Sequence, residues 1–213
     1  MTITALEPFT RGKNRIAVYL NDEFSFVLYK GELSKYGLLA GMDLSEELYE
    51  RIVNETLTKR ARLRGMNLLQ KMDRTESDIR QKLIEGGYPE EVVDDAIDYL
   101  KSFHYIDDSR YASDYIRFKR NSMSRREIER KLLEKGISPD IVAAQFDEMD
   151  EYDSETSEDH ELNLVKKLLK KKMGINEEQT VTLEYEEKMK IFSYFYRKGF
   201  SMELVERAYR DLT

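Results

Sequence analysis

The sequence predicts a mainly α protein: three tandem three-helix repeats forming an elongated curved solenoid, with a small N-terminal β-hairpin appendage. Two observations lead to this prediction. The same pattern of helix, glycine turn and helix occurs three times in the 213 residues, and an internal repeat outranks any local interpretation. Residues 1–45 depart from the pattern, because they contain runs rich in β-branched and aromatic residues, which favour strands.

The repeat is clearest around Gly136, where one helix ends and the next begins. Gly136 can adopt the left-handed conformation that ends a helix, with Ile137 folding back on Leu132. Ser138 then caps the following helix. Upstream, Ser124 opens the first helix of the pair, and the glutamate three positions later completes the sequence of a capping box.

Two other segments keep the same register. Gly87 and Gly199 take the place of Gly136, and Thr75 takes the place of Ser124. The helix after each turn then carries one apolar stripe, as expected for a helix with one buried face. These stripes are Val92, Val93, Ala96, Ile97 and Leu100; Ile141, Val142, Phe146 and Met149, interrupted by Gln145; and Leu204, Val205, Ala208, Tyr209 and Leu212.

The expected domains are a β-hairpin appendage at 1–45 and three-helix repeats at 46–101 and 102–150, followed at 151–213 by an acidic junction and repeat three. In the appendage, residues 16–20 and 24–28 form the hairpin around a polar turn. Residues 2–6 could add a third strand that ends before Pro8. Strands this few need to dock on the helices to be stable.

The first helix of repeat one starts at Ser45 and could continue, bent near Gly65, to Met72. Repeat two starts where Asp107 or Asp108 caps a helix, since carboxylates suit a helix N-terminus. That helix carries Tyr111, Tyr115 and Phe118. A catalytic role for the two aspartates is the weaker interpretation, because adjacent side chains point apart and no nucleophile accompanies them.

Residues 147–161 are rich in carboxylates and contain no Lys or Arg. This composition favours a mobile or extended junction, about which repeats two and three can reorient. A helix restarts at Leu162, with lysines on its other face, and residues 174–182 form an insertion that lengthens repeat three.

Composition argues against several functional classes. There is no cysteine and there are only two histidines, so a metal site or thiol chemistry has few ligands. Glycine-rich phosphate loops and serine-nucleophile turns are also missing from the sequence. We therefore expect no enzyme, cofactor or metal. Without a signal-peptide core or an apolar run of membrane-spanning length, we expect a cytoplasmic monomer.

The net charge of −7 conceals two basic stretches, residues 59–82 and 110–135, each with a local charge of +5. One interpretation is that these are solvated helix faces; the other is that they bind an anionic surface, either acidic protein or nucleic-acid backbone. A helix-turn-helix DNA reader is disfavoured, because five carboxylates on the helix after Gly87 would meet the DNA phosphates.

The segment from Tyr105 to Ala112 (YIDDSRYA), together with Leu132 and the pair Gly136-Ile137, resembles the RecX family of bacterial recombination regulators. The resemblance covers residue 55 to the end. It implies a modulator in DNA repair and the SOS response that binds the RecA-DNA filament and inhibits recombinase activity. The alternative is a non-enzymatic helical repeat protein that acts on DNA directly. Weak binding to single- or double-stranded DNA fits both.

Because the basic residues are concentrated in a few stretches, we predict that they bind the partner. The basic residues of repeat two would form the central contacts. For Arg110 the alternative is an ion pair within its own repeat, with Asp107 or Glu127. The candidates are Arg110, Arg117, Lys119, Arg120, Arg125 and Arg126, extended by Lys71 and Arg74 in repeat one and by Lys166, Lys167 and Lys170 in repeat three.

Overall fold

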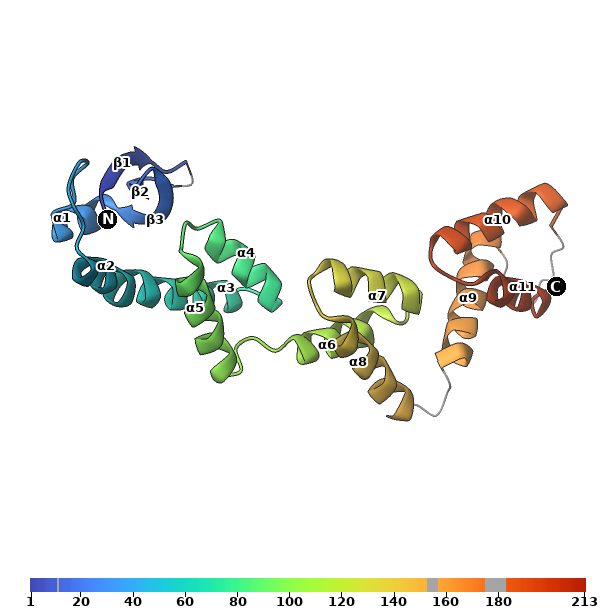
Figure 1. The fold of residues 1–213 in the computed structure, drawn as a ribbon. Coiled ribbons are helices and arrows are strands. Elements are labelled where there is room, and N and C mark those ends of the chain that lie inside the picture. Colours follow the sequence, from blue (N-terminus) through green and yellow to red (C-terminus); the bar gives the residue numbers. More distant parts are fainter. Residues whose placement is uncertain (11, 153–156, 175–182) are drawn as a thin grey trace. The chain divides into compact units, whose positions relative to one another are not determined.

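The computed structural model describes residues 1–10, 12–152, 157–174 and 183–213. Its contacts divide the chain into two units, Met1–Asp107 and Asp108–Thr213. Helices dominate both units, and a small sheet stands at the N-terminus (Figure 1). The prediction of a mainly α chain of three-helix repeats behind a small β element is confirmed. In the described part of the chain, no helix has the length and hydropathy needed to cross a membrane.

The N-terminal element is a three-stranded antiparallel sheet in the order β1-β2-β3, with β1 at Ile3–Pro8, β2 at Arg15–Leu20 and β3 at Glu23–Tyr29. The hairpin was correctly predicted. The two residues between β2 and β3, Asn21 and Asp22, both have positive φ, as the usual two-residue hairpin turn requires. The expected end of the first strand before Pro8 was wrong: Pro8 pairs with Ile16, which an edge strand permits.

The sheet is docked on the helices of its own unit. Phe26 and Leu28 of β3 are fully buried in one core with Leu57 of the first repeat. On the outer edge of β3, the N–H of Val27 donates to the carbonyl oxygen of Gly87 at 3.0 Å. The glycine turn of repeat one therefore covers the edge of the sheet, which would otherwise offer unpaired backbone groups to other strands.

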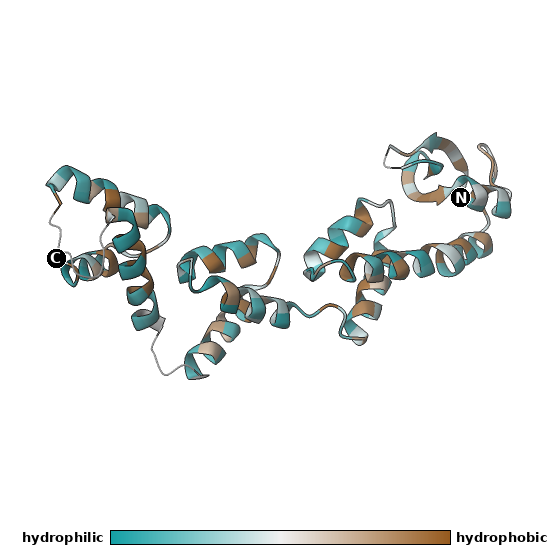
Figure 2. Ribbon diagram, turned by 180° about the vertical axis from the view of Figure 1, so that it is seen from behind, coloured by the Kyte–Doolittle hydropathy of each residue, from teal (hydrophilic) through white to brown (hydrophobic). Residues whose placement is uncertain are grey.

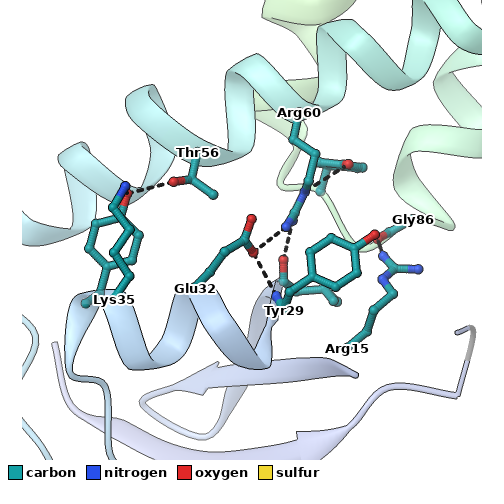
Figure 3. A network of polar contacts seen from close by, with 10 residues as sticks. Arg15, Tyr29, Glu32, Lys35, Thr56, Arg60 and Gly86 are labelled. Atoms are coloured by element: carbon teal, nitrogen blue, oxygen red, sulfur yellow. Dashed lines mark hydrogen bonds and ion pairs between the residues drawn. The ribbon is translucent and has the colours of Figure 1, made fainter. Parts of the chain in front are cut away.

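Arg60 holds the sheet to the first repeat at the point shown in Figure 3. Its guanidinium donates to the carbonyl oxygen of Val27 at 2.5 Å and to the hydroxyl of Tyr88 at 3.2 Å, and it pairs with the Glu32 carboxylate. The same guanidinium lies over the rings of Tyr29 and Tyr88, 5.0 and 5.2 Å from their centroids. One side chain thus joins β3, the helix after it and the glycine turn.

After β3 come a short helix, α1 (Lys30–Tyr36), and then the long first helix of repeat one. Ser45 caps it, accepting from the N–H of Leu48 at 3.2 Å. The helix runs through α2 (Glu46–Ile52), a π-helical segment η1 (Val53–Thr58) and α3 (Lys59–Leu69). The π-helical segment, which the sequence did not predict, ends seven residues before Gly65. Gly65 serves close packing, because a Cβ there would lie 2.5 Å from Cδ1 of Leu100.

Helices α4 (Glu76–Ile84) and α5 (Glu90–Ser102) complete repeat one. The predicted apolar stripe of α5 is buried. The acidic side of α5 is paired within the unit: Asp95 forms two 2.8 Å bonds with Arg62, and Asp94 pairs with Arg80. Part of the positive charge counted over residues 59–82 is therefore used inside the repeat.

Repeat two consists of α6 (Asp108–Lys119), α7 (Arg125–Glu134) and α8 (Pro139–Tyr152). Its core contains Ala112 and Ile116 of α6. Tyr111 and Tyr115 pack at the edge of this core with their rings stacked 6.3 Å apart. Phe118 does not follow them inward: 76% of it is exposed. Across the repeats, hydrophobic and hydrophilic residues take different sides of the helices (Figure 2).

Repeat three consists of α9 (Ser157–Met173), α10 (Tyr185–Arg197) and α11 (Met202–Arg210), with Phe192 and Phe195 fully buried. The expectation of an extended acidic junction over 147–161 was wrong for most of its length, because α8 continues to Tyr152 and α9 begins at Ser157. Residues 153–156, and most of the proposed insertion at 174–182, lie outside the described residues.

The predicted glycine turns are present in all three repeats. Gly87, Gly136 and Gly199 have φ of 79°, 81° and 90°. After each glycine, the next N–H reaches back to a carbonyl oxygen five residues earlier, which is the Schellman arrangement. These bonds are Tyr88 to Leu83 at 3.4 Å, Ile137 to Leu132 at 3.2 Å and Phe200 to Phe195 at 3.2 Å.

Candidate partner-binding surface

Helix α6 carries two of the candidate basic residues that are exposed to solvent. Arg110 and Arg117 are exposed and are seven positions apart, so they lie on the same side of the helix. Between Arg117 and the half-buried Lys119 stands Phe118, whose ring lies 4.7 Å from the Lys119 Nζ atom. We call Arg117, Phe118 and Lys119 the α6 patch. It combines one exposed apolar ring with the basic residues that precede and follow it in the sequence.

Two other nominated residues, Arg120 and Arg125, are turned inward. Both line a pocket of 480 Å³ inside the second unit, together with His160 and Glu161 of α9. The charge of Arg125 is balanced by ion pairs with Glu129 and Asp150, each at 3.0 Å. Its guanidinium also lies 4.3 Å from the Phe146 ring centroid. Arg125 is therefore a structural ion-pair residue of repeat two.

Repeats two and three are joined at the N-terminus of α7. The fully buried hydroxyl of Ser124 accepts from the N–H of Glu127 at 3.1 Å and donates to the carbonyl oxygen of Lys198 at 2.7 Å. Beside it, the Glu161 carboxylate accepts from the N–H of Arg125 at 2.7 Å. Burial raises the pKa of the Glu161 carboxyl, while the N–H and positive charge of Arg125 act to lower it.

Arg126 does not line the 480 Å³ pocket but a separate groove. With Arg130 of α7 it lines a groove of 680 Å³, and the opposite wall is Tyr194, Tyr196, Arg197 and Lys198 at the end of α10. We call this the turn groove, because its lining includes Gly199 of the glycine turn of repeat three. An adjoining pocket of 410 Å³ shares Tyr194 and Lys198 with it.

In the first unit, the two nominated residues differ. Lys71 is exposed just after α3. Arg74 pairs with Asp78, and only 17% of its side chain is exposed. Arg74 therefore belongs to the local packing at the start of α4 more than to an open face.

The lysines of α9 divide in the same way. Lys166 forms a 2.6 Å ion pair with Asp211, and this partner lowers the pKa of the Asp211 carboxyl. Lys167 is exposed, and Lys170 is half-buried. Lys172, further along the helix, lies over the ring of Tyr194 at 4.5 Å from its centroid.

Sequence reasoning missed two features. Phe118 was grouped with Tyr111 and Tyr115 of the same helix, and its exposure was not predicted. The run from Tyr194 to Lys198, in which aromatic residues lead directly into two cations, was not singled out at all. No group of three or more His, Asp or Glu side chains in the described ranges is arranged to hold a metal ion.

Comparison with known proteins matches three family models to the three repeats: the first three-helix domain of RecX at residues 61–100, the second at 107–144 and the third at 158–209. Together they cover more than half of the chain. The chain belongs to the RecX family. RecX proteins of this family from Clostridium perfringens strain 13 and Clostridium acetobutylicum, both named regulatory protein RecX, are each 28% identical to it. Each alignment spans 99% of this chain and 96% of the relative.

Two solved structures are similar to this chain. A crystal structure of regulatory protein RecX aligns with a TM-score of 0.61 at 26% identity, covering 99% of this chain and 98% of the other. The crystal structure of RecX from Lactobacillus salivarius aligns with a TM-score of 0.57 at 21% identity, covering 73% of this chain and 96% of the other. The second likeness shows a shared fold. As a RecX-family member, the chain is a regulatory protein.

Proposed function

We propose that this chain binds the RecA-type recombinase filament on DNA and inhibits recombinase activity, acting in homologous recombination and DNA repair. The family membership supports a regulatory role, and the α6 patch supports binding to a macromolecular surface. The observation that carries the proposal is the 76% exposure of Phe118 between Arg117 and Lys119.

The chemistry of the α6 patch suits a protein partner. An exposed aromatic ring loses area to water on docking, and Arg and aromatic side chains are the residue types that most often dominate interface energy. The cations beside the ring add attraction toward an anionic surface, although the chain as a whole has a net charge of −7. A recombinase filament offers both protein surface and DNA phosphate.

The test is a titration of purified recombinase assembled on single-stranded DNA, with ATP hydrolysis and filament length as readouts. The wild-type chain should lower both and should bind the filament more tightly than bare DNA. The double variant Arg117→Glu and Lys119→Glu should lose most of this effect and keep its helical circular dichroism spectrum.

A matched control reverses two exposed lysines of the first unit, Lys13→Glu and Lys59→Glu. It has the same change in net charge and should act on the recombinase as the wild type does. A recombinase unaffected by the wild-type chain, or equal affinity for filament and bare DNA, would overturn the regulator proposal in favour of a protein that acts on DNA directly.

A further inference from the structure

We infer that the turn groove is a binding site for single-stranded nucleic acid, used separately from the α6 patch. This deepens the proposed function, on which its biological role rests, by assigning phosphate contacts and protein contacts to different residues. The groove lies within the second unit, between the start of α7 and the end of α10.

The groove and the adjoining pocket concentrate positive charge. Arg126, Arg130, Arg197 and Lys198 line the groove, and Lys171 and Lys172 line the adjoining pocket. Among the lining residues of both, Glu127 is the sole carboxylate. Although the chain has a net charge of −7, this cluster would attract a polyanion electrostatically.

Three of the groove cations are available to a ligand, whereas Arg130 pairs with Glu134 of its own helix. Arg62 and Arg125 each bond carboxylates of their own unit. Within the described ranges, Arg126, Arg197 and Lys198 form no ion pair, and all three are exposed. A ligand phosphate can therefore pair with them without displacing an existing carboxylate.

The aromatic rings in the groove favour single-stranded nucleic acid over other polyanions. Tyr196 lines the groove and is 58% exposed, and Tyr194 lines both the groove and the adjoining pocket. Proteins that bind single strands combine a cationic track with aromatic rings on which unpaired bases stack. A duplex buries its base faces and cannot use Tyr196 in this way. An acidic peptide would satisfy the cations but would leave the ring with no matching partner.

The groove is also held in shape. The backbone of its lining at Lys198 and Gly199 is held by the bond from Ser124 to the Lys198 carbonyl oxygen. Gly199 is required for this close approach, because a Cβ there would lie 2.6 Å from the Ser124 Oγ atom. The backbone segments that carry the cations are therefore held next to each other, while the exposed side chains can adjust to a phosphate backbone.

The experiment is fluorescence anisotropy of a labelled oligothymidylate with the full chain and no recombinase, measured over a range of salt concentrations. The wild type should bind the single strand more tightly than a duplex of equal length. The triple variant Arg126→Ala, Arg197→Ala and Lys198→Ala should weaken binding strongly and make the slope of log affinity against log salt shallower by roughly 2, since each lost phosphate contact contributes about 0.7.

Tyr196→Leu should weaken binding at least about fivefold without changing the salt slope, because it removes stacking and leaves the charge in place. Tyr185→Leu is the matched control, since Tyr185 is 75% exposed at the other end of α10, and its binding should equal that of the wild type. Circular dichroism melting of each variant checks the fold.

Each result decides the inference. No binding by the wild type, equal affinity for duplex, or a triple variant that binds as the wild type does would overturn it. Tighter binding of polyglutamate than of the oligonucleotide would assign the groove to an acidic protein. None of these outcomes alters the recombinase titration, so the two proposals fail independently.

Discussion

Ser124 and Lys198, 74 residues apart, are joined by a 2.7 Å hydrogen bond from the serine Oγ to the lysine carbonyl oxygen. The same hydroxyl caps α7. One side chain thus begins a helix of repeat two and holds the turn of repeat three, so local capping and the contact between repeats depend on each other.

We predict that Ser124→Ala lowers the free energy of unfolding of the second unit by about 2 kcal/mol, because it removes a cap and leaves the Lys198 carbonyl oxygen without this donor. Ser201→Ala is the matched control: Ser201 caps α11 by a 3.2 Å bond from the N–H of Leu204, but it is exposed. The control should cost about 1 kcal/mol. Urea unfolding measures both variants. Equal losses in the free energy of unfolding would contradict a stabilising role for the bond between Ser124 and Lys198.

A second prediction concerns the glycine turn at Gly87, which covers the edge of β3. Gly87→Ala should destabilise the first unit severely, because φ is 79° and a Cβ would lie 2.2 Å from Cγ2 of Val27. Gly37→Ala is the comparison, since Gly37 has φ of 64° but no atom within 4 Å of the position that a Cβ would take. It should cost only about 1 kcal/mol of backbone strain. Similar melting temperatures for the two variants would show that the contact with Val27 is readily relieved.

The sequence predicted the turns and caps well because they obey local rules. Gly136 and Ser138 are recognisable from their immediate neighbours, and the repeat supplied three instances of the same pattern. The π-helical segment η1 and the packing role of Gly65 were missed, since both depend on what lies opposite the helix. The contact that explains Gly65 comes from Leu100, 35 residues away in the sequence.

The candidate site was predictable only as a charge pattern. In sequence, Arg62, Arg117 and Arg125 are equivalent members of basic stretches. In the fold, Arg62 meets Asp95 from 33 residues away and Arg125 meets Asp150 from 25 residues away, while Arg117 stays exposed. Which cation is already paired is a property of tertiary contacts, and no local spacing reports it.

A third prediction contrasts a half-buried cation with an open one. Arg60→Ala should cost roughly 3 to 5 kcal/mol, because it leaves Glu32, 23% exposed, without its partner and removes the bond to Val27. Arg62→Ala should cost at most about 1 kcal/mol, since Arg62 and Asp95 are 36% and 41% exposed and solvent screens them. Chemical unfolding of the two variants checks the order, and a larger loss for Arg62→Ala would contradict it.

A fourth prediction concerns pH. Burial raises the pKa of Glu161, so the folded chain holds this proton more tightly than the unfolded chain does. Stability is then lost as pH rises from the ordinary value of 4.5 through the raised pKa. Glu161→Gln keeps an oxygen for the N–H of Arg125 and removes the buried charge. Its stability relative to the wild type should therefore increase from pH 4.5 towards neutrality, and parallel melting curves over that range would contradict the prediction.

The last prediction separates the ring of the α6 patch from its charges. Phe118→Ala removes an exposed apolar side chain, so it should leave the melting temperature nearly unchanged. If the ring docks into a partner, the loss of binding should reach about 2 kcal/mol, which is roughly thirtyfold in affinity for the recombinase filament.

The salt dependence should separate the two kinds of contact. Phe118→Ala should retain the wild-type response to salt, because Arg117 and Lys119 remain, whereas reversal of those two charges should reduce it. Tyr185→Ala provides the control, since Tyr185 is exposed to the same extent at the start of α10, and it should bind the filament as the wild type does. Equal losses for the phenylalanine and tyrosine variants would mean that neither ring marks a specific contact, and unchanged binding for Phe118→Ala would leave only charge at the α6 patch.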